Sequence, residues 1–155
     1  MPSFHAGRSP SLRSPCRRAQ LFAAAACWLA APLVLAQSQN MITPADLKKR
    51  LESGDKPMLV DIQPEADFAK HHLPGAMATF AYPAKSDDER AKLKPALARI
   101  LASKDDVVIV CPAGGGGAKN TYEFLKSQGV PESRLRILEK GQRGWPYPEL
   151  VKQGQ

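Results

Sequence analysis

The sequence predicts an α/β fold of three layers, in which a central parallel sheet is flanked by helices, and three observations support this class. Residues 58–62 and 107–110 form two short, largely apolar runs, as expected for strands that are buried on both faces. Segments with helix start and stop residues lie between the runs. Parallel strands need such crossover connections, so the alternation favours a parallel sheet.

The other elements are predicted from their capping and turn residues. A helix begins at Thr43, which can cap it, has Pro44 in its first turn, and ends at Gly54. In chain order we then expect a strand at 58–62, a helical turn at 65–70, a turn at 72–76, an extended segment at 76–82, a helix at 87–102, a strand at 107–110, a helix at 118–128 and a strand at 136–138. Pro95 must lie early in the 87–102 helix or kink it.

Length and charge fit one domain of ordinary size. The chain has 155 residues and a formal net charge of +7. Residues 1–36 hold four arginines and no acidic residue, which leaves a surplus of only +3 for the rest of the chain. That surplus is too small to indicate binding to nucleic acid, and we expect none.

Residues 1–36 predict a cleaved export signal. A basic stretch rich in serine and proline leads into an apolar run at 21–36, and Val34 and Ala36 supply small side chains at the −3 and −1 positions of a cleavage site. The run contains Pro32 and is shorter than the roughly 20 apolar residues that span a bilayer. We therefore expect a mature domain at 37–155 that is periplasmic or otherwise exported and has no membrane attachment after cleavage.

Two variants of this signal fit less well. Arg17 and Arg18 suggest a twin-arginine signal, but Gln20 stands where such a signal prefers an apolar residue. Cys27 suggests lipidation, but the apolar run continues for nine residues beyond it, up to Ala36. A simple secretory signal is the better interpretation.

Cys111 is the only cysteine of the predicted mature domain, so it has no partner for an internal disulfide. It directly follows an apolar strand and precedes four glycines. Glycines let successive backbone N–H groups turn toward one anion, and the next helix adds its positive end, so the loop favours a thiolate with an oxyanion beside it. The alternative is a flexible turn that carries a buried, inert cysteine. The candidate substrate-binding residues are Ala113, Gly114, Gly115, Gly116, Gly117, Ala118 and Lys119.

Three segments together resemble the rhodanese-like domains. Residues 42–77, with Asp61 at a strand end and a His-Leu-Pro-Gly-Ala turn at 72–76, are similar to the first half of the family. Residues 107–130 are similar to its cysteine loop and following helix, and residues 137–145 to its closing strand and turn. The resemblance implies the same fold, with catalytic Cys111 and with Asp61 and His72 as structural support.

The resemblance also implies sulfur transfer without a cofactor. A thiolate at Cys111 takes a sulfane sulfur from a small donor such as thiosulfate, holds it as a persulfide and passes it to a thiol or cyanide acceptor; a protein acceptor is also compatible. Active members usually carry an arginine five residues after the cysteine, and related phosphatases carry one six residues after it. Here those positions are Gly116 and Gly117, and Gln63 replaces the usual basic residue near Asp61.

The absence of an arginine at these positions favours some candidate functions over others. Phosphoester cleavage needs a bidentate cation on a dianion, whereas a persulfide carries at most one negative charge that N–H groups can stabilise. Sulfur transfer is therefore preferred, with Lys119 as the nearest replacement cation. The alternative is a catalytically weak module of the same fold that binds a partner or carries sulfur.

Other candidates are weaker. His71 and His72 suggest a metal site, but no cysteine or carboxylate lies at ligand spacing, and we expect no metal. Asp61 is either a general base or an acceptor for loop N–H groups, and the second role is more common at such a position. Trp145 and Tyr147 either line the pocket or pack the last turn.

The signal prediction has a direct test. Cleavage after Ala36 gives a protein that begins at Gln37 and is recovered in the soluble exported fraction. N-terminal sequencing of protein isolated from an expressing bacterium measures this. Retention of Met1, or extraction only with detergent, contradicts it.

Overall fold

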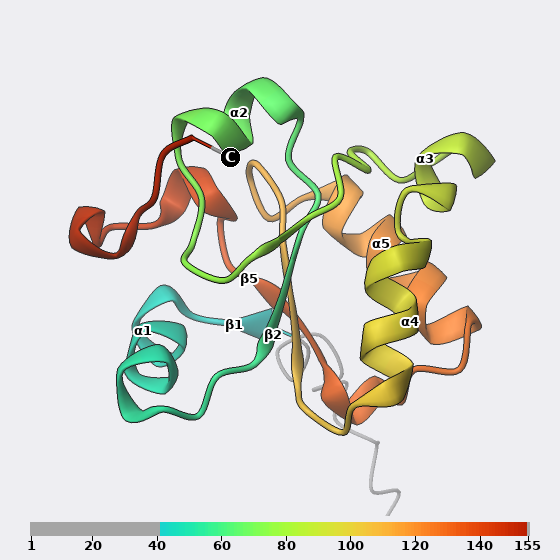
Figure 1. Cartoon of the computed structure of the whole chain (residues 1–155), viewed down its shortest axis with the longest axis horizontal. Coiled ribbons are helices and arrows are strands. Elements are labelled where there is room, and N and C mark those ends of the chain that lie inside the picture. Colours follow the sequence, from blue (N-terminus) through green and yellow to red (C-terminus); the bar gives the residue numbers. More distant parts are fainter. Residues whose placement is uncertain (1–40, 155) are drawn as a thin grey trace, which may run out of the picture. The chain divides into compact units, whose positions relative to one another are not determined.

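The computed structural model describes residues 41–154 of the chain (Figure 1). The predicted signal at 1–36 and the predicted start of the mature domain at Gln37 lie outside these residues. Within 41–154, none of the helices combines the length and the apolar character needed to cross a membrane.

Five parallel strands form one sheet in the order β1-β5-β4-β2-β3. The strands are β1 (Met41–Ile42), β2 (Met58–Asp61), β3 (Met77–Ala78), β4 (Val107–Val110) and β5 (Leu135–Leu138). In the central pair, Leu59 lies opposite Val108 and Asp61 opposite Val110. The prediction of a parallel sheet is confirmed, and residues 107–110 form its central strand.

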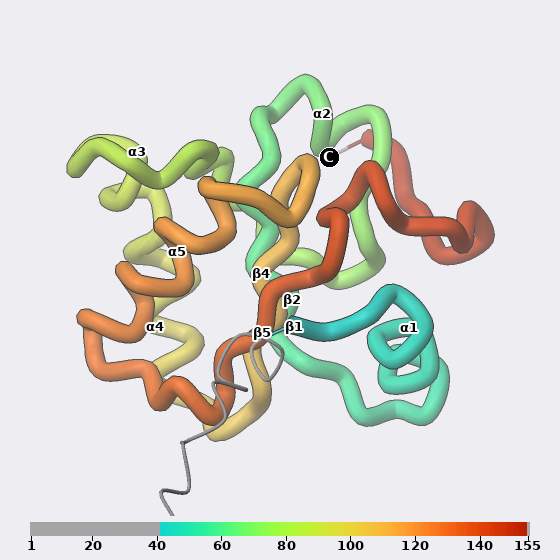
Figure 2. Tube along the Cα trace, turned by 180° about the vertical axis from the view of Figure 1, so that it is seen from behind, coloured from blue at the N-terminus to red at the C-terminus, as the bar shows by residue number. Residues whose placement is uncertain are grey.

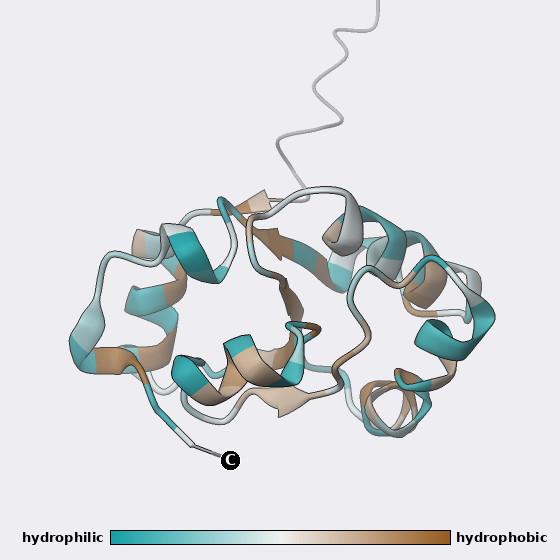
Figure 3. Ribbon diagram, turned by 90° about the horizontal axis from the view of Figure 1, so that it is seen from above, coloured by the Kyte–Doolittle hydropathy of each residue, from teal (hydrophilic) through white to brown (hydrophobic). Residues whose placement is uncertain are grey.

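Helices cover both faces of this sheet (Figure 2). The α-helices are α1 (Pro44–Ser53), α2 (Glu65–Lys70), α3 (Asp87–Ala91), α4 (Lys94–Ala102) and α5 (Gly116–Ser127). The 3-10 helices are η1 (Glu132–Arg134), η2 (Gln142–Gly144) and η3 (Pro148–Leu150). The apolar strands run between the helical layers (Figure 3), which confirms the three-layer fold class.

Two apolar clusters, one on each face, make up the core. Val60 and Ile109 belong to the cluster that contains residues of α4 and α5, whereas Leu59 and Val108 belong to the cluster around Leu47 of α1. Neighbouring residues of one strand thus enter opposite clusters, as the alternation of side chains along a strand requires. This explains why the strand sequences are apolar throughout instead of alternating.

The first helix forms as predicted. The Thr43 hydroxyl accepts a hydrogen bond from the backbone N–H of Asp46, and Pro44 occupies the first turn. Gly54 ends the helix with a left-handed φ of 85°. These cap residues fix both ends of α1 locally.

The prediction of one helix at 87–102 is wrong, because two helices occupy this range. Ser86 caps α3 through a capping box with Glu89, and the helix ends at Ala91. Pro95 then lies in the first turn of α4, where its missing N–H removes no helical hydrogen bond. The proline therefore marks a second helix start.

Several other boundaries differ from the prediction. The extended segment expected at 76–82 contains only the two-residue strand β3, because Phe80 takes a left-handed φ of 53° and turns the chain. The last strand begins at Leu135, one residue early, and β2 ends at Asp61. Strand β1 was not predicted, since a two-residue strand has too few residues to show a pattern.

The double-sided burial of β4 leads to a stability prediction. Ile109 has no solvent exposure, so Ile109→Asp places an unpaired carboxylate in the core, and we expect a loss of more than about 4 kcal/mol and an unfolded protein. Lys85→Asp changes an exposed residue and is expected to leave stability nearly unchanged. Thermal unfolding followed by circular dichroism measures both. Equal melting temperatures contradict the assignment of β4.

Candidate active site

Cys111 lies directly after β4, at the carboxyl edge of the sheet. Its side chain is buried, with 1% of the residue exposed, and it is the free cysteine of the described part of the chain. The backbone N–H of Gly114 donates a hydrogen bond to Sγ over 2.9 Å. The sulfur therefore already has one backbone donor that a thiolate would use.

Gly114 needs to be glycine for two reasons. Its φ of 69° lies in the left-handed region, and a Cβ atom there would lie 2.7 Å from the backbone nitrogen of Lys140. This conformation turns the Gly114 N–H back toward Sγ. Gly114 is thus a backbone donor to Sγ, while its role in binding substrate stays a prediction.

A turn formed by Lys140, Gly141 and Gln142 holds the start of the cysteine loop, and this contact was not predicted from the sequence. The Gln142 N–H donates to the carbonyl of Cys111 over 2.8 Å, and the Arg143 N–H donates to the carbonyl of Pro112 over 3.0 Å. A Cβ on Gly141 would overlap the Cys111 carbonyl oxygen. The Lys-Gly pair is a weak turn signal, and nothing in the sequence shows which loop the turn contacts.

The rest of the cysteine loop is open. Helix α5 begins at Gly116, two residues earlier than predicted, and follows Gly115 as N-cap. A Cβ on Gly115 or Gly116 would meet no atom within 4 Å. Ala113 and Lys119 are exposed, and Ala118 is buried at the start of the helix. No cationic side chain occurs from Pro112 to Ala118, so backbone groups alone form this part of the loop.

Gly117 differs from its neighbours because Tyr82 packs on it. A Cβ on Gly117 would lie 2.7 Å from two ring carbons of Tyr82 and 3.4 Å from Ile62. The backbone N–H of Tyr82 donates to the Ile62 carbonyl, and the side chain of Asn120 donates to the carbonyl of the next residue, Pro83. With 43% of its surface exposed, Tyr82 contacts the first turn of α5 and also faces solvent. No sequence pattern indicates this contact, because the two segments are distant along the chain.

Asp61 is a buried acceptor in this structure. Its carboxylate accepts hydrogen bonds from the backbone N–H of Gln63 over 2.8 Å and from the Gln63 side chain over 3.0 Å. Burial raises the pKa of Asp61 to about 6, although the bonds from Gln63 act in the opposite direction. Asp61 follows Leu59 by two residues and so points to the α1 face, whereas Cys111 belongs to the cluster on the α4 and α5 face. The sheet separates the two groups, which disfavours Asp61 as a base for the thiol.

His72 bonds locally. Its Nδ1 lies 2.9 Å from the carbonyl oxygen of Phe68, and its ring stacks on the Phe68 ring with centroids 3.9 Å apart. In residues 41–154, no group of three or more His, Cys, Asp or Glu side chains is placed to hold a metal ion. Trp145 and Tyr147 pack edge to face in the α1 cluster, so packing accounts for this pair.

A family model described as a rhodanese-like domain matches residues 43–146. The chain belongs to the rhodanese-like family. A search of curated proteins finds no significant sequence match.

Solved structures share the fold at low sequence identity. A Saccharomyces cerevisiae protein, described as a homolog of single-domain rhodanese and Cdc25 phosphatase catalytic domain, has a TM-score of 0.61 and 18% identity over 75% of this chain and 88% of that one. A second structure of this yeast protein is described as a protein tyrosine phosphatase of the rhodanese family. Bacillus halodurans protein BH2092 has a TM-score of 0.56 and 18% identity over 75% of this chain and 78% of that one.

A thiosulfate sulfurtransferase from Pseudomonas aeruginosa also shares the fold. It has a TM-score of 0.55 and 24% identity over 74% of this chain. The match covers only 19% of the Pseudomonas chain, so that protein is several times longer than the matched region. At these identities the structures establish the fold.

The raised pKa of Asp61 predicts how stability depends on pH. An unfolded aspartate has a pKa near 3.9, so the folded protein retains this proton up to about pH 6. The free energy of unfolding should therefore fall as the pH rises from about 4 to about 6, by about 3 kcal/mol for this group. Asp61→Asn should remove that fall. Chemical denaturation between pH 4 and pH 7 measures it.

Asp88→Asn is the matched control, because Asp88 is exposed in the first turn of α3. This variant should keep the pH dependence of the unmodified protein. Identical slopes for the unmodified protein and Asp61→Asn contradict the prediction.

Proposed function

We propose that this protein is an exported sulfurtransferase that carries sulfane sulfur as a persulfide on Cys111. The observation that supports this most directly is the position of Sγ after β4, 2.9 Å from the Gly114 N–H, in a loop without a cationic side chain before the start of α5. Membership of the rhodanese-like family makes sulfur transfer the first reaction to test.

The proposed reaction has two nucleophilic steps. In the first, the Cys111 thiolate attacks the outer sulfur of a donor such as thiosulfate; the new S–S bond forms as the donor bond breaks, and sulfite leaves with the electron pair. In the second, a thiolate or cyanide acceptor attacks the outer sulfur of the persulfide, and the Cys111 thiolate is regenerated. No other oxidant or reductant is needed.

The burial of Cys111 is compatible with this chemistry. Only 1% of the residue is exposed, but a second sulfur adds about 2 Å to the side chain. Gly115 and Gly116 leave space open on the loop. An acceptor therefore needs to reach the outer sulfur and not the cysteine itself, which also allows a protein thiol as acceptor.

The absence of an arginine favours weakly charged donors. Backbone N–H groups can stabilise the single negative charge of a persulfide, whereas a phosphoester dianion calls for a planar, bidentate cation. We therefore rank sulfur transfer above phosphatase activity, although the fold is shared with a yeast protein described as a phosphatase. Thiosulfate is itself a dianion and should therefore be a poor donor. In α5, Lys119 is the cationic residue that follows the cysteine loop most closely in the sequence.

Intact-mass measurement tests the persulfide. We expect protein incubated with a sulfane donor to gain ~32 Da, and to lose it on treatment with a reductant. Cys111→Ser should show no gain. If no donor produces the adduct while the unmodified protein remains folded, the loop is inactive and the alternative of a binding module holds. An adduct without turnover indicates a sulfur carrier.

Adding the missing cation tests the explanation for weak turnover. Gly116→Arg has open space around it, so we expect thiosulfate turnover to rise about tenfold, as one charge-assisted hydrogen bond would give. Gly117→Arg has the same charge but meets the Tyr82 ring, and it should not raise turnover. Steady-state kinetics of both variants measures the difference. No change in Gly116→Arg contradicts the explanation.

A further inference from the structure

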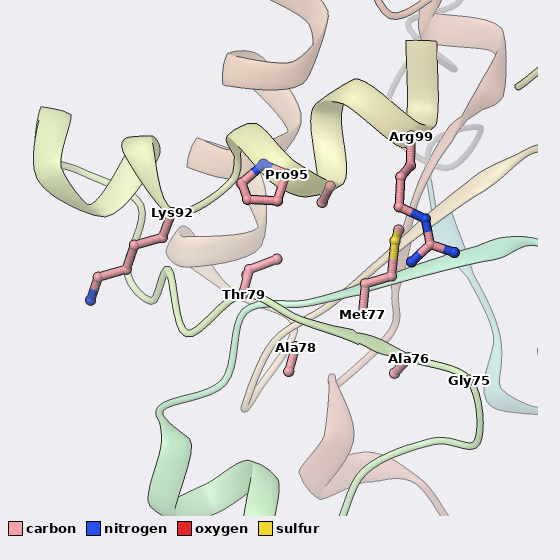
Figure 4. A pocket seen from close by; sticks show the side chains of 9 residues that line it. Gly75, Ala76, Met77, Ala78, Thr79, Lys92, Pro95 and Arg99 are labelled. Atoms are coloured by element: carbon pink, nitrogen blue, oxygen red, sulfur yellow. The ribbon is translucent and has the colours of Figure 1, made fainter. Parts of the chain in front are cut away.

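A groove of about 380 Å³ lies between β3 and the α4 region, and no residue of the Cys111 loop lines it (Figure 4). Met77 of β3 and the following Thr79 line it on one side, and Pro95 and Ala96 of α4 line it on the other. Lys92 and Arg99 stand toward its two ends. None of these residues belongs to the site proposed above.

Strand β3 is an edge strand with free backbone groups. It pairs only with β2, and no other strand of residues 41–154 lies beyond it. The Thr79 N–H donates to the Asp61 carbonyl over 2.9 Å. In a parallel ladder alternate residues bond to the same neighbour, so both the N–H and the carbonyl of Ala78 point away from β2. Ala78 is exposed and can pair with a further strand.

The charge along the groove has one sign. Arg99 makes no ion pair with any residue of 41–154. The ammonium of Lys92 lies 3.4 Å from the carbonyl oxygen of Phe80, which is a neutral acceptor. Helix α4 contains no acidic residue. A ligand that matches this surface carries negative charge.

The spacing of the two cations fits an extended peptide. Lys92 and Arg99 are seven residues apart along nearly continuous helical backbone, which corresponds to a rise of about 10 Å. Side chains on one face of a strand repeat every ~7 Å, so two acidic side chains that are two or four residues apart lie within reach of these long cations. The small side chains of Ala76 and Ala78 let the backbone of another strand approach β3 closely.

We propose that this groove binds an extended, acidic segment of a partner protein, which adds a strand to the free edge of β3. The segment exchanges main-chain hydrogen bonds with Ala78 and places carboxylates against Lys92 and Arg99. Strand addition of this kind obtains affinity from the backbone and specificity from alternate side chains. The proposal does not depend on the chemistry at Cys111.

The probe is the peptide acetyl-Glu-Val-Glu-Val-Glu-Val-amide, titrated into the purified protein at about 0.15 M salt, where distant charges are screened. We expect saturable binding that weakens about tenfold in Arg99→Glu, because an attraction becomes a repulsion. Lys94→Glu is the matched control, because Lys94 belongs to α4 like Arg99 and the substitution changes the charge by the same amount. Lys94 follows Lys92 by two residues, so its side chain points about 200° away from that of Lys92 around the helix axis. It should change the affinity less than twofold, and Cys111→Ser should not change it.

Amide hydrogen exchange distinguishes strand addition from simple charge attraction, because charge attraction alone would not change the exchange rate of the Ala78 amide. The Ala78 amide should exchange freely in the unbound protein and become protected when the peptide saturates it. Ala78→Pro removes only this outward N–H and should abolish binding, since an edge strand tolerates proline where no ladder bond is lost. If that variant fails to fold, the exchange measurement on the unmodified protein still decides.

Three results overturn the proposal. The first is a lack of saturable binding, or equal binding of a peptide with lysine in place of glutamate. The second is unchanged affinity in Arg99→Glu. The third is an Ala78 amide that stays unprotected in the complex, which indicates a different docking mode, or one that is already protected in the free protein, which indicates that the edge is covered.

Discussion

The four residues of β4, Val107–Val110, have no solvent exposure, and they hydrogen-bond to β2 on one side and β5 on the other. A strand held in this way cannot shift by one residue without moving each side chain into the opposite cluster of the core. The position of Cys111 at the carboxyl edge is therefore fixed by packing on both faces. The loop beyond it needs no long side chains to determine where the sulfur lies.

The cysteine loop is rigid at one end and open at the other. The turn at Lys140–Gln142 binds the backbone of Cys111, and Gly114 fits against the same turn with no room for a side chain. Gly115 and Gly116 have no such contacts. The four consecutive glycines thus have three different surroundings: Gly114 meets backbone, Gly117 meets the Tyr82 ring, and the two between them face open space. Only the two outer glycines are required by close packing.

The sequence predicted those parts of the structure that short segments determine alone. The caps at Thr43 and Gly54, the apolar run of β4 and the cysteine at its end are all local signals, and each lies where it was expected. The local restriction at Pro95 fits a kink as well as a new helix start, so it does not by itself predict that residues 87–102 form two helices. The Gly141 contact with Cys111 and the Tyr82 contact with Gly117 were not predicted, because each joins segments about 30 residues apart whose meeting depends on the completed sheet.

The two ends of the cysteine loop are held by different neighbours, so the loop tolerates a change in length best at its middle. The segment from Cys111 to Gly114 is attached to the Lys140–Gln142 turn, and the segment from Gly117 onward is attached to α5 and Tyr82. An extra residue is therefore accommodated most readily between Gly115 and Gly116. Such an insertion would change the open part of the loop without displacing the sulfur. In the proposed reaction, the size of the donor or acceptor that fits beside the loop could therefore vary while the reacting sulfur stays in place.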